Sequence, residues 1–234
     1  MGVGVHAWIS QRSADGASAA PFADLNLSHG VGDDACAVAT NRAVAARSIG
    51  VEAGQVTWMD QVHGDAVAVV TRPTLVAGVD ALVTAQPGVA LAVQVADCLP
   101  LVIADAAAGV VGVAHSGRPG TALGVASRLV AEMTRQGAAP AQMRALLGPA
   151  ICGRCYEVPT QLQVQVSRSV PEAVCRTRTG TAGIDLHAGV TAQLRRAGVR
   201  DLYHDPRCTL ESPELFSYRR DGRTGRFAAY VWRA

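Results

Sequence analysis

The most apolar stretch of the chain, residues 89–108, is too often interrupted to cross a membrane. It is broken by polar side chains and one proline, namely Gln94, Asp97, Cys98, Pro100 and Asp105. Because a bilayer core penalises carboxylates heavily, this composition favours buried strands of a globular core. We expect strands over residues 90–95 and 99–104, on either side of the polar segment. The wholly apolar residues 110–114 predict a third, central strand.

Apolar periodicity and capping residues predict four helices. They are expected over residues 35–51, 121–136, 157–169 and 185–197. The last of these begins at the N-capping Asp185 and ends at Gly198, and residues 117–120 predict a turn. Further strands are expected over residues 56–59, 66–71, 80–84, 144–147 and 226–232.

Strands and helices are mixed along the chain without a regular βαβ unit, an internal repeat or a linker. This order predicts an α/β (α+β) fold in which helices flank a mixed β-sheet core. The chain has 234 residues, 49% of them hydrophobic, which suffices for one domain over residues 1–234. A core of this size folds without disulfides or a structural metal, so we expect any metal site to serve chemistry.

Charge and targeting signals exclude several classes of function. The net charge is +2, and all 21 basic residues are arginine. They are scattered, apart from a cluster over residues 219–226, so nucleic acid is not an expected partner. The first ten residues lack the basic and apolar regions of an export signal. We therefore expect a cytoplasmic monomer that binds no membrane, with its six cysteines reduced or bound to metal.

Three potential metal ligands follow predicted strands. His63 lies in DQVHGD, Cys98 in QVADCLP and His115 in GVAHSG. One thiolate and two imidazoles suit zinc, and three protein ligands leave the fourth position open for water or substrate. The wide spacing matches no short motif, so two alternatives remain. The residues can be a buried free cysteine beside two loop histidines, or the nucleophile and base of a metal-free hydrolase.

Several longer segments resemble one family. They are ADLNLSHGVGDDACAVATNR, DQVHGD, DALVT, QPGVALAVQVADCLPLVIAD, GVAHSG, LGPAI, CYEV and CTLESPELFSYRRDGRTGR. Together they resemble the multicopper polyphenol oxidase, or laccase-domain, family. Its members are also called laccase-domain purine nucleoside phosphorylases or peptidoglycan editing factors. The resemblance covers residues 22–232, nearly the whole chain.

The resemblance implies a compact α/β sandwich with a zinc ion on His63, Cys98 and His115. It also implies phosphorolysis of adenosine, inosine, guanosine and methylthioadenosine, and hydrolytic deamination of adenosine. The expected partners are therefore purine nucleosides and phosphate, and the expected cofactor is Zn²⁺ before copper.

The chain departs from the family pattern at four places. HSGRPG replaces the usual HAGWRG after the third ligand, and His29 stands one residue further from the Val-Gly-Asp motif than is usual. Arg154 replaces the first cysteine of the usual CCYE, and Cys152 stands where glycine is common. Val95 replaces the threonine before Ala-Asp-Cys.

Further roles are assigned as hypotheses. Asp97 directly precedes the potential ligand Cys98. It can orient the metal site or act as general acid or base, or it can cap a turn. Arg42 and Arg118 are candidates for binding phosphate, because a guanidinium binds oxygens in pairs. Asn26 can contact ribose or base, and His29 can reach the same pocket. For each, a solvated or turn-forming side chain is the alternative.

Cys152 and Cys155 form a Cys-x-x-Cys pair, and no second pair follows at the spacing of a zinc finger. We therefore expect two unlinked thiols rather than a structural zinc site or a redox pair. Cys208 matches a family motif and is expected to pack beneath the site.

Three other functions compete with a purine enzyme. A copper oxidase of phenols would need many histidines, and His6, His187 and His204 would have to converge on the site. A cell-wall precursor hydrolase would use Cys98 as nucleophile with a histidine base. The altered loop after His115 is also compatible with a protein that binds nucleosides without turnover.

Overall fold

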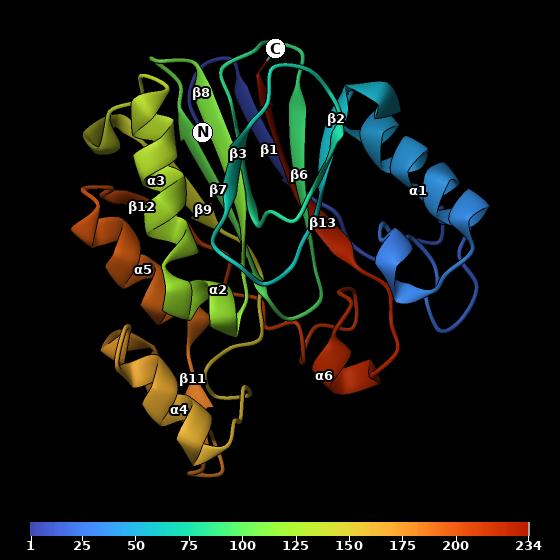
Figure 1. Ribbon diagram of the computed structural model, residues 1–234. Coiled ribbons are helices and arrows are strands. Elements are labelled where there is room, and N and C mark those ends of the chain that lie inside the picture. The colour runs from blue at the N-terminus through green and yellow to red at the C-terminus, as the bar shows by residue number, and fades with distance from the viewer. Residues whose placement is uncertain (234) are drawn as a thin grey trace.

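Two β-sheets lie face to face, and helices cover their outer sides (Figure 1). A computed structural model describes residues 1–233. The five-stranded sheet has the order β1 (Val5–Ile9), β13 (Phe227–Arg233), β6 (Ala90–Val95), β2 (Val56–Asp60) and β4 (Leu75–Ala77). The six-stranded sheet has the order β12 (Asp201–His204), β9 (Arg144–Leu147), β7 (Leu99–Asp105), β8 (Val110–Ser116), β5 (Ala81–Thr84) and β3 (Val67–Val69).

The apolar stretch found in the sequence passes from one sheet to the other. β6 pairs with β13 and β2 in the first sheet, while β7 pairs with β8 and β9 in the second. Every residue of β7 and β8 is buried, because the opposite sheet covers one face and helices cover the other. This two-sided burial explains why these strands are almost wholly apolar. Residues 96–98, which include Asp97 and Cys98, form the crossing between the sheets.

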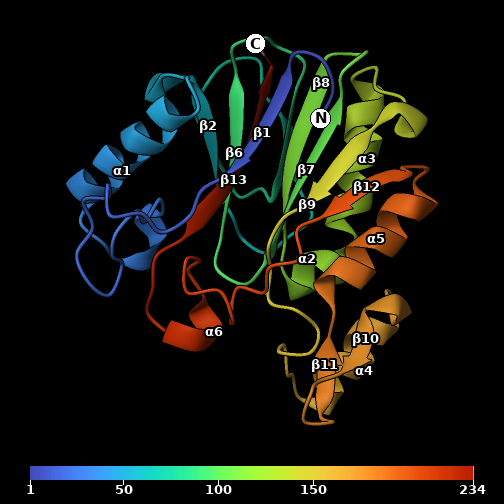
Figure 2. The same ribbon diagram turned by 180° about the vertical axis from the view of Figure 1, so that it is seen from behind.

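Six helices and one hairpin complete the described part of the chain. They are α1 (Ala35–Ser48), α2 (Arg118–Leu123), α3 (Val125–Arg135), α4 (Thr160–Ser167), α5 (Leu186–Arg196), α6 (Tyr218–Asp221) and the hairpin of β10 (Val174–Arg176) with β11 (Ala182–Ile184). α3 and α5 cover the six-stranded sheet and α1 covers the other (Figure 1). Figure 2 shows α4 and the hairpin together at one end, beside α5.

The predicted class is confirmed, but four details differ. The core contains two facing mixed sheets rather than one mixed sheet. The expected turn over residues 117–120 is wrong, because α2 already begins at Arg118. The expected helix over 121–136 is two helices, since Gly124 adopts a φ of 88° that ends α2 and starts α3. α4 begins at Thr160 rather than at 157, with Pro159 as its N-cap.

Other boundaries agree closely with the expected ones. Asp34 and Asp185 cap α1 and α5 by accepting the N–H groups of Ala37 and Ala188.

In residues 1–233, no helix combines the length and the apolar character that a membrane crossing requires.

Candidate metal site and its cavity

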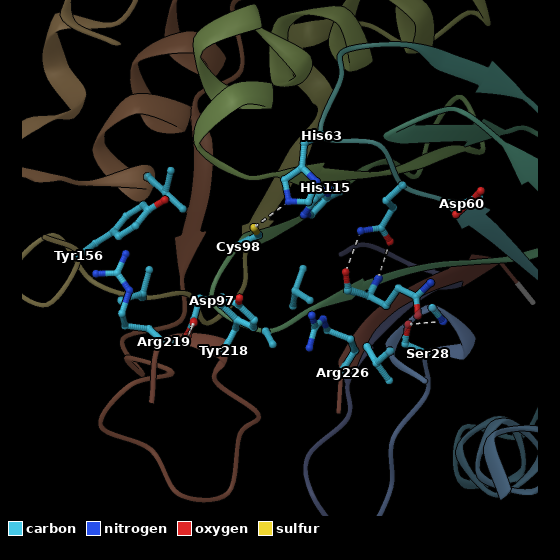
Figure 3. Close-up of a pocket in the computed structure, with 18 residues that line it drawn as sticks. Ser28, Asp60, His63, Asp97, Cys98, His115, Tyr156, Tyr218, Arg219 and Arg226 are labelled. Atoms are coloured by element: carbon cyan, nitrogen blue, oxygen red, sulfur yellow. Dashed lines mark hydrogen bonds between the residues drawn. The ribbon is translucent and has the colours of Figure 1, made fainter. Parts of the chain in front are cut away.

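Three side chains from distant parts of the sequence meet at one end of the sheets (Figure 3). His63 follows β2, Cys98 lies in the crossing between β6 and β7, and His115 is near the end of β8. We call them the histidine–cysteine cluster. Their ligand atoms lie within 4.8 Å of one another, and Cys98 Sγ is 3.9 Å from His63 Nε2. Tetrahedral zinc separates sulfur from nitrogen by about 3.5 Å, so the cluster fits zinc after small shifts.

Asp80 holds two of the three ligands in place. It is fully buried, and its Oδ1 accepts a hydrogen bond from His115 Nδ1 at 2.8 Å. This bond leaves Nε2 of His115 to face the metal position. The same carboxylate accepts the backbone N–H groups of residues 62–64. Burial alone would raise the pKa of Asp80, but these hydrogen bonds hold it below its usual value.

The backbone beside the cluster is strained at two residues. His63 has a φ of 61° and Asp97 a φ of 92°, a region that residues other than glycine rarely adopt. Such a conformation costs on the order of 1–3 kcal/mol and persists only where the surroundings enforce it. At His63 the enforcing group is Asp80, which accepts the N–H groups of the turn.

The surroundings of Cys98 and His115 favour the charged form of both side chains. Burial raises the pKa of the Cys98 thiol, but the charge and hydrogen bonds of the two histidines outweigh it and lower the pKa to about 6. Burial lowers the pKa of His115, but the Cys98 thiolate and Asp80 raise it to about 9. The cysteine is therefore a thiolate at neutral pH, which is the form that binds metals.

Gly117 is required by close packing against the cluster. A Cβ atom at this position would lie 2.9 Å from Cys98 Sγ and 3.0 Å from the His63 ring. The glycine of the family motif is therefore retained in the altered loop, although its neighbours have changed.

The cluster forms part of the wall of a cavity of about 580 Å³ (Figure 3). This size suits a small organic molecule. Figure 3 shows the cluster along one side of the cavity and Tyr218, Arg219 and Arg226 along another. The remaining lining residues include Ser28, Asp60, Gln61, Gln94 and Tyr156.

Two arginines line this cavity. Nη1 of Arg226 donates to the carbonyl oxygens of Thr224 and Gly225, and burial lowers the pKa of this guanidinium. Nη1 of Arg219 donates to Glu157 O, and its guanidinium lies over the ring of Tyr156. In residues 1–233, no acceptor bonds Nη2 of either arginine.

Two glutamines also shape the cavity. The side chain of Gln61 bonds both backbone groups of Gln94. The side-chain oxygen of Gln94 is buried and has no hydrogen-bond partner among the described residues. This oxygen is therefore closed to solvent, although other atoms of Gln94 line the cavity.

Asp97 lines the cavity, but its carboxylate is engaged by the chain itself. Oδ1 accepts from the hydroxyl groups of Thr209 and Ser217, each at 2.6 Å, and Oδ2 accepts from Arg219 N at 2.6 Å. These contacts fix the start of α6 and the strained backbone next to Cys98. The geometry thus favours the turn-capping role over acid–base chemistry.

The other predicted site residues lie outside the cavity wall. Arg42 stacks on Trp58 at 3.8 Å and donates to Leu27 O, and burial lowers its pKa to about 10. Asn26 is fully buried and donates to Asp33 and Ser28 O.

Arg118 opens α2 and does not reach the cavity wall. His29 is exposed, although its neighbours Ser28 and Gly30 line the cavity.

Sequence reasoning missed Asp80 and Arg226 as parts of this site. A carboxylate directly before the apolar residues 81–84 was a usable signal, because a buried acid needs a partner. The basic cluster over residues 219–226 was noticed, but Arg226 was not connected with the pocket.

The chain is similar to known proteins over nearly its whole length. The profile of a family described as multi-copper polyphenol oxidoreductase laccase matches residues 6–234. A purine nucleoside phosphorylase of Streptomyces griseus is 52% identical over 221 residues, which cover 93% of this chain and 90% of that protein.

Two solved structures share the fold. YlmD from Geobacillus stearothermophilus superposes with a TM-score of 0.92 at 36% identity, covering 99% of this chain and 92% of that one. YfiH from Bacillus licheniformis also gives a TM-score of 0.92, at 31% identity over 98% of this chain and 93% of that one.

Proposed function

The chain belongs to the multi-copper polyphenol oxidoreductase laccase family, and on this premise we propose that it is a zinc-dependent purine nucleoside phosphorylase. The proposed substrates are adenosine, inosine, guanosine and methylthioadenosine. Phosphate would cleave each of them to the free base and the sugar 1-phosphate. We propose deamination of adenosine as a second activity of the same site.

One observation carries the proposal. The histidine–cysteine cluster, held by the buried Asp80, shares a cavity of nucleoside size with two guanidinium groups. A metal beside a site for phosphate is what phosphorolysis by a metal enzyme requires. The name of the Streptomyces griseus relative, at 52% identity, points to the same reaction.

The donor set favours zinc over copper. Of the six histidines, all in the described part of the chain, only His63 and His115 belong to the cluster. His187 and His204 stack on each other, and His6 stacks on a tryptophan. The several histidine-rich centres of a multicopper oxidase therefore do not form. Zinc bound here would supply a Lewis acid with one open coordination position.

Arg219 and Arg226 are our candidates for holding phosphate, in place of Arg42 and Arg118. In phosphorolysis a phosphate oxygen bonds to C1′ of the ribose while the bond from C1′ to the purine nitrogen breaks. The base leaves with a proton. The free N–H groups of the two arginines would orient the phosphate for this attack, because a guanidinium fork binds oxygens in pairs.

Gln94 is our candidate for contacting the base. Its side chain lines the cavity, and its amide NH₂ group can donate to the 6-oxo group of hypoxanthine or guanine. The amide oxygen is buried in the structure, and after rotation of the amide it can accept a hydrogen bond from the 6-amino group of adenine. An amide at this position therefore accounts for activity on both kinds of purine.

Deamination is supported by the chemistry of the donors. Zinc deaminases of nucleobases also use histidine and cysteine ligands. This reaction would require the base, rather than the ribose, to lie beside the cluster, with water attacking C6 and ammonia leaving.

Metal analysis and product analysis on the same samples test the proposal. The protein is purified without a metal-affinity tag, as wild type, Cys98→Ala and the control Cys36→Ala, whose thiol is exposed on α1. We expect Cys98→Ala to contain one zinc fewer per chain. We also expect only this variant to lose the phosphate-dependent release of adenine from adenosine.

Other outcomes would redirect the assignment. Inosine as the only product would leave a deaminase and refute the phosphorylase. Copper in place of zinc, with oxidation of phenols, would favour the oxidase. Turnover of a cell-wall precursor by metal-free protein would favour Cys98 as a nucleophile, and tight nucleoside binding without turnover would indicate a binding protein.

A further inference from the structure

A second group of metal-binding side chains lies outside the site described above. The sulfur atoms of Cys152, Cys155 and Cys208 and the carboxylate of Glu211 all lie within 4.8 Å of one another. We call them the cysteine–glutamate cluster. The expectation of two unlinked thiols overlooked Cys208, which is distant in sequence and is brought to the pair by the fold.

Two turns of the same form present the four ligands. In the first, the N–H groups of Cys155 and Tyr156 both donate to Cys152 O at 2.9 Å. In the second, the N–H groups of Glu211 and Ser212 donate to Cys208 O at 3.0 and 2.9 Å. Each turn carries a ligand at its first and fourth residue, the Cys-x-x-Cys spacing that structural zinc sites use.

The two turns are joined directly. Ala150 and Cys208 form a parallel β-bridge, and Thr209 N donates to Ala150 O at 3.1 Å. Cys152 N donates to Cys208 Sγ at 3.3 Å. A backbone N–H aimed at a cysteine sulfur stabilises the thiolate, because it supplies partial positive charge.

The surroundings balance the charge of a filled site. Zinc with three thiolates and one carboxylate carries a net charge of about −2. Nη2 of Arg178 lies 3.4 Å from Cys155 Sγ and also pairs with Glu211. Arg154 lies within the first turn. Two arginines thus accompany the four anionic ligands.

We propose that Cys152, Cys155, Cys208 and Glu211 bind a second, structural zinc ion. Four protein ligands complete a tetrahedron and leave no position for substrate. Thiolates select zinc over the magnesium and calcium ions that prefer oxygen.

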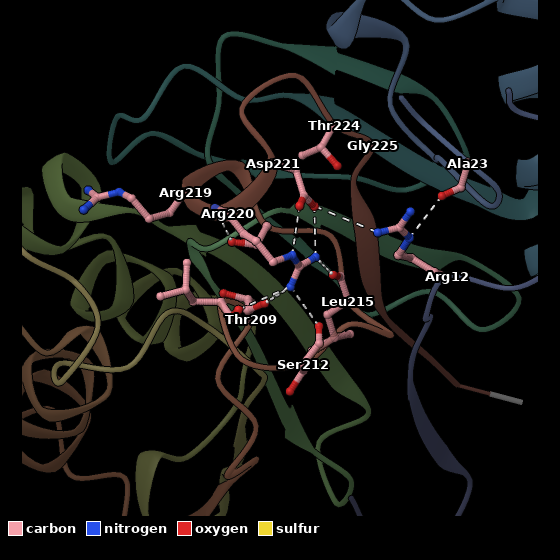
Figure 4. A network of polar contacts seen from close by, with 12 residues as sticks. Arg12, Ala23, Thr209, Ser212, Leu215, Arg219, Arg220, Asp221, Thr224 and Gly225 are labelled. Atoms are coloured by element: carbon pink, nitrogen blue, oxygen red, sulfur yellow. Dashed lines mark hydrogen bonds and ion pairs between the residues drawn. The ribbon is translucent and has the colours of Figure 1, made fainter. Parts of the chain in front are cut away.

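The proposed ion would fix part of the cavity wall. Tyr156, which lines the cavity, directly follows Cys155. Thr209, which directly follows Cys208, donates to the Asp97 carboxylate. Arg220 holds the same segment from another direction by donating to the carbonyl oxygens of Thr209, Ser212 and Leu215 (Figure 4).

Counting zinc in matched variants tests the second site. We expect two zinc ions per chain in the wild type, one in Cys98→Ser, one in Cys155→Ser and none in the double variant. Cys175→Ser is the control, because Cys175 donates to Gly153 O beside the cluster without belonging to it. This variant should retain both ions.

Cobalt substitution gives a second readout. Co²⁺ bound by three thiolates should absorb more strongly in the sulfur charge-transfer region than Co²⁺ bound by Cys98 alone, because each thiolate ligand adds to this absorption. Should Cys155→Ser fold poorly, Glu211→Ala, at an exposed position, gives the same test. It removes a ligand, and the loss of even an outer partner of a ligand lowers metal affinity by about 10-fold or more, so its second zinc should pass to a chelator at least about 10-fold more readily than in wild type.

Several results would overturn the second site while leaving the first intact. One is a single zinc per wild-type chain that disappears in Cys98→Ser. Another is a disulfide among the three cysteines, seen as a loss of two hydrogens in freshly purified protein. Conversely, a single zinc that survives in Cys98→Ser but not in Cys155→Ser would support the second site and refute the zinc assignment under the proposed function.

Discussion

The histidine–cysteine cluster and the cysteine–glutamate cluster are built in opposite ways. The ligands of the first stand near the ends of strands from both sheets, and the packing of those sheets brings them together. The ligands of the second stand on two short turns joined by a single β-bridge. One arrangement is set by the packing of the core, whereas the other depends on two local turns and on the bridge that joins them.

The two clusters are alike in burial but differ in the number of ligands. Each has one buried ligand, His115 or Cys208, and one exposed ligand, His63 or Glu211. The first cluster has three ligands and opens into a cavity, while the second has four and is closed. A prebuilt open site suits chemistry, and a closed site on turns suits stabilisation of the chain. Loss of metal should therefore abolish activity at the first and local order at the second.

Gly117→Ala is expected to break the first cluster and spare the second. The added methyl group would displace Cys98 and the His63 ring. A displacement of about 1 Å costs about 100-fold in rate, so we expect kcat/KM for adenosine to fall by about that factor. Zinc content should fall by one ion per chain.

The control for this variant is Gly54→Ala, because nothing lies within 4 Å of a Cβ atom at Gly54. Unchanged activity and zinc content in Gly117→Ala would contradict the close packing inferred around Cys98.

Asp80→Asn is expected to weaken the first cluster without destroying it. An amide cannot balance the charge of His115 and turns an NH₂ group toward the donors of residues 62–64. Removing such a partner of a metal ligand lowers metal affinity by about 10- to 100-fold, measurable by competition with a chelator.

Asp105→Asn separates this effect from a general loss of stability. Asp105 is also buried and accepts three backbone N–H groups, but it contacts no ligand. The Asp105→Asn substitution should lower the free energy of unfolding and leave zinc affinity unchanged. Equal zinc affinity in the two variants would refute the orienting role of Asp80.

Comparing Asp80→Asn with wild type also tests a prediction about pH. The pKa of Asp80 is held below its usual value, so its stabilisation is fully present above the usual pKa of about 3.9 and is lost as the pH falls through the lowered one. In metal-free protein, the difference in stability between wild type and Asp80→Asn should shrink only under strongly acid conditions.

The elements that sequence predicted well are those whose own composition determines their place. β6 was expected at its observed bounds, and β7 and β8 differ by one or two residues. Burial on both faces makes these strands almost wholly apolar, and the residues missed at the ends of β7 and β8 are polar. β4 and β12 were missed because they are short, largely exposed edge strands without that signal.

The same distinction applies to the sites. The strand-end positions of His63, Cys98 and His115 could be read locally, and the structure brings these residues together. By contrast, Arg42 and Arg226 look alike in sequence, and only the fold turns one onto Trp58 and the other toward the cavity. The cysteine–glutamate cluster depends on a bridge between distant residues that no local pattern reveals.

Thr209→Val tests whether the two clusters are physically linked, and its expected effect is the smallest. Thr209 is fully buried beside Cys208, and its hydroxyl donates to the Asp97 carboxylate at 2.6 Å. A hydrogen bond to a charged group contributes at least about 1.5 kcal/mol, so the free energy of unfolding should fall by about that amount. Because Asp97 lines the cavity next to Cys98, KM for nucleosides should rise as well.

Thr57→Val is the matched control, because Thr57 is equally buried but its hydroxyl has no partner among the described residues. Removing an unsatisfied hydroxyl is neutral or stabilising, so this variant should keep its stability and its KM. Both proteins should retain their zinc, since neither residue is a ligand. If Thr209→Val matched Thr57→Val in stability and in KM, Asp97 would not transmit the order of the second cluster to the first. The two clusters would then act independently of each other within the same protein.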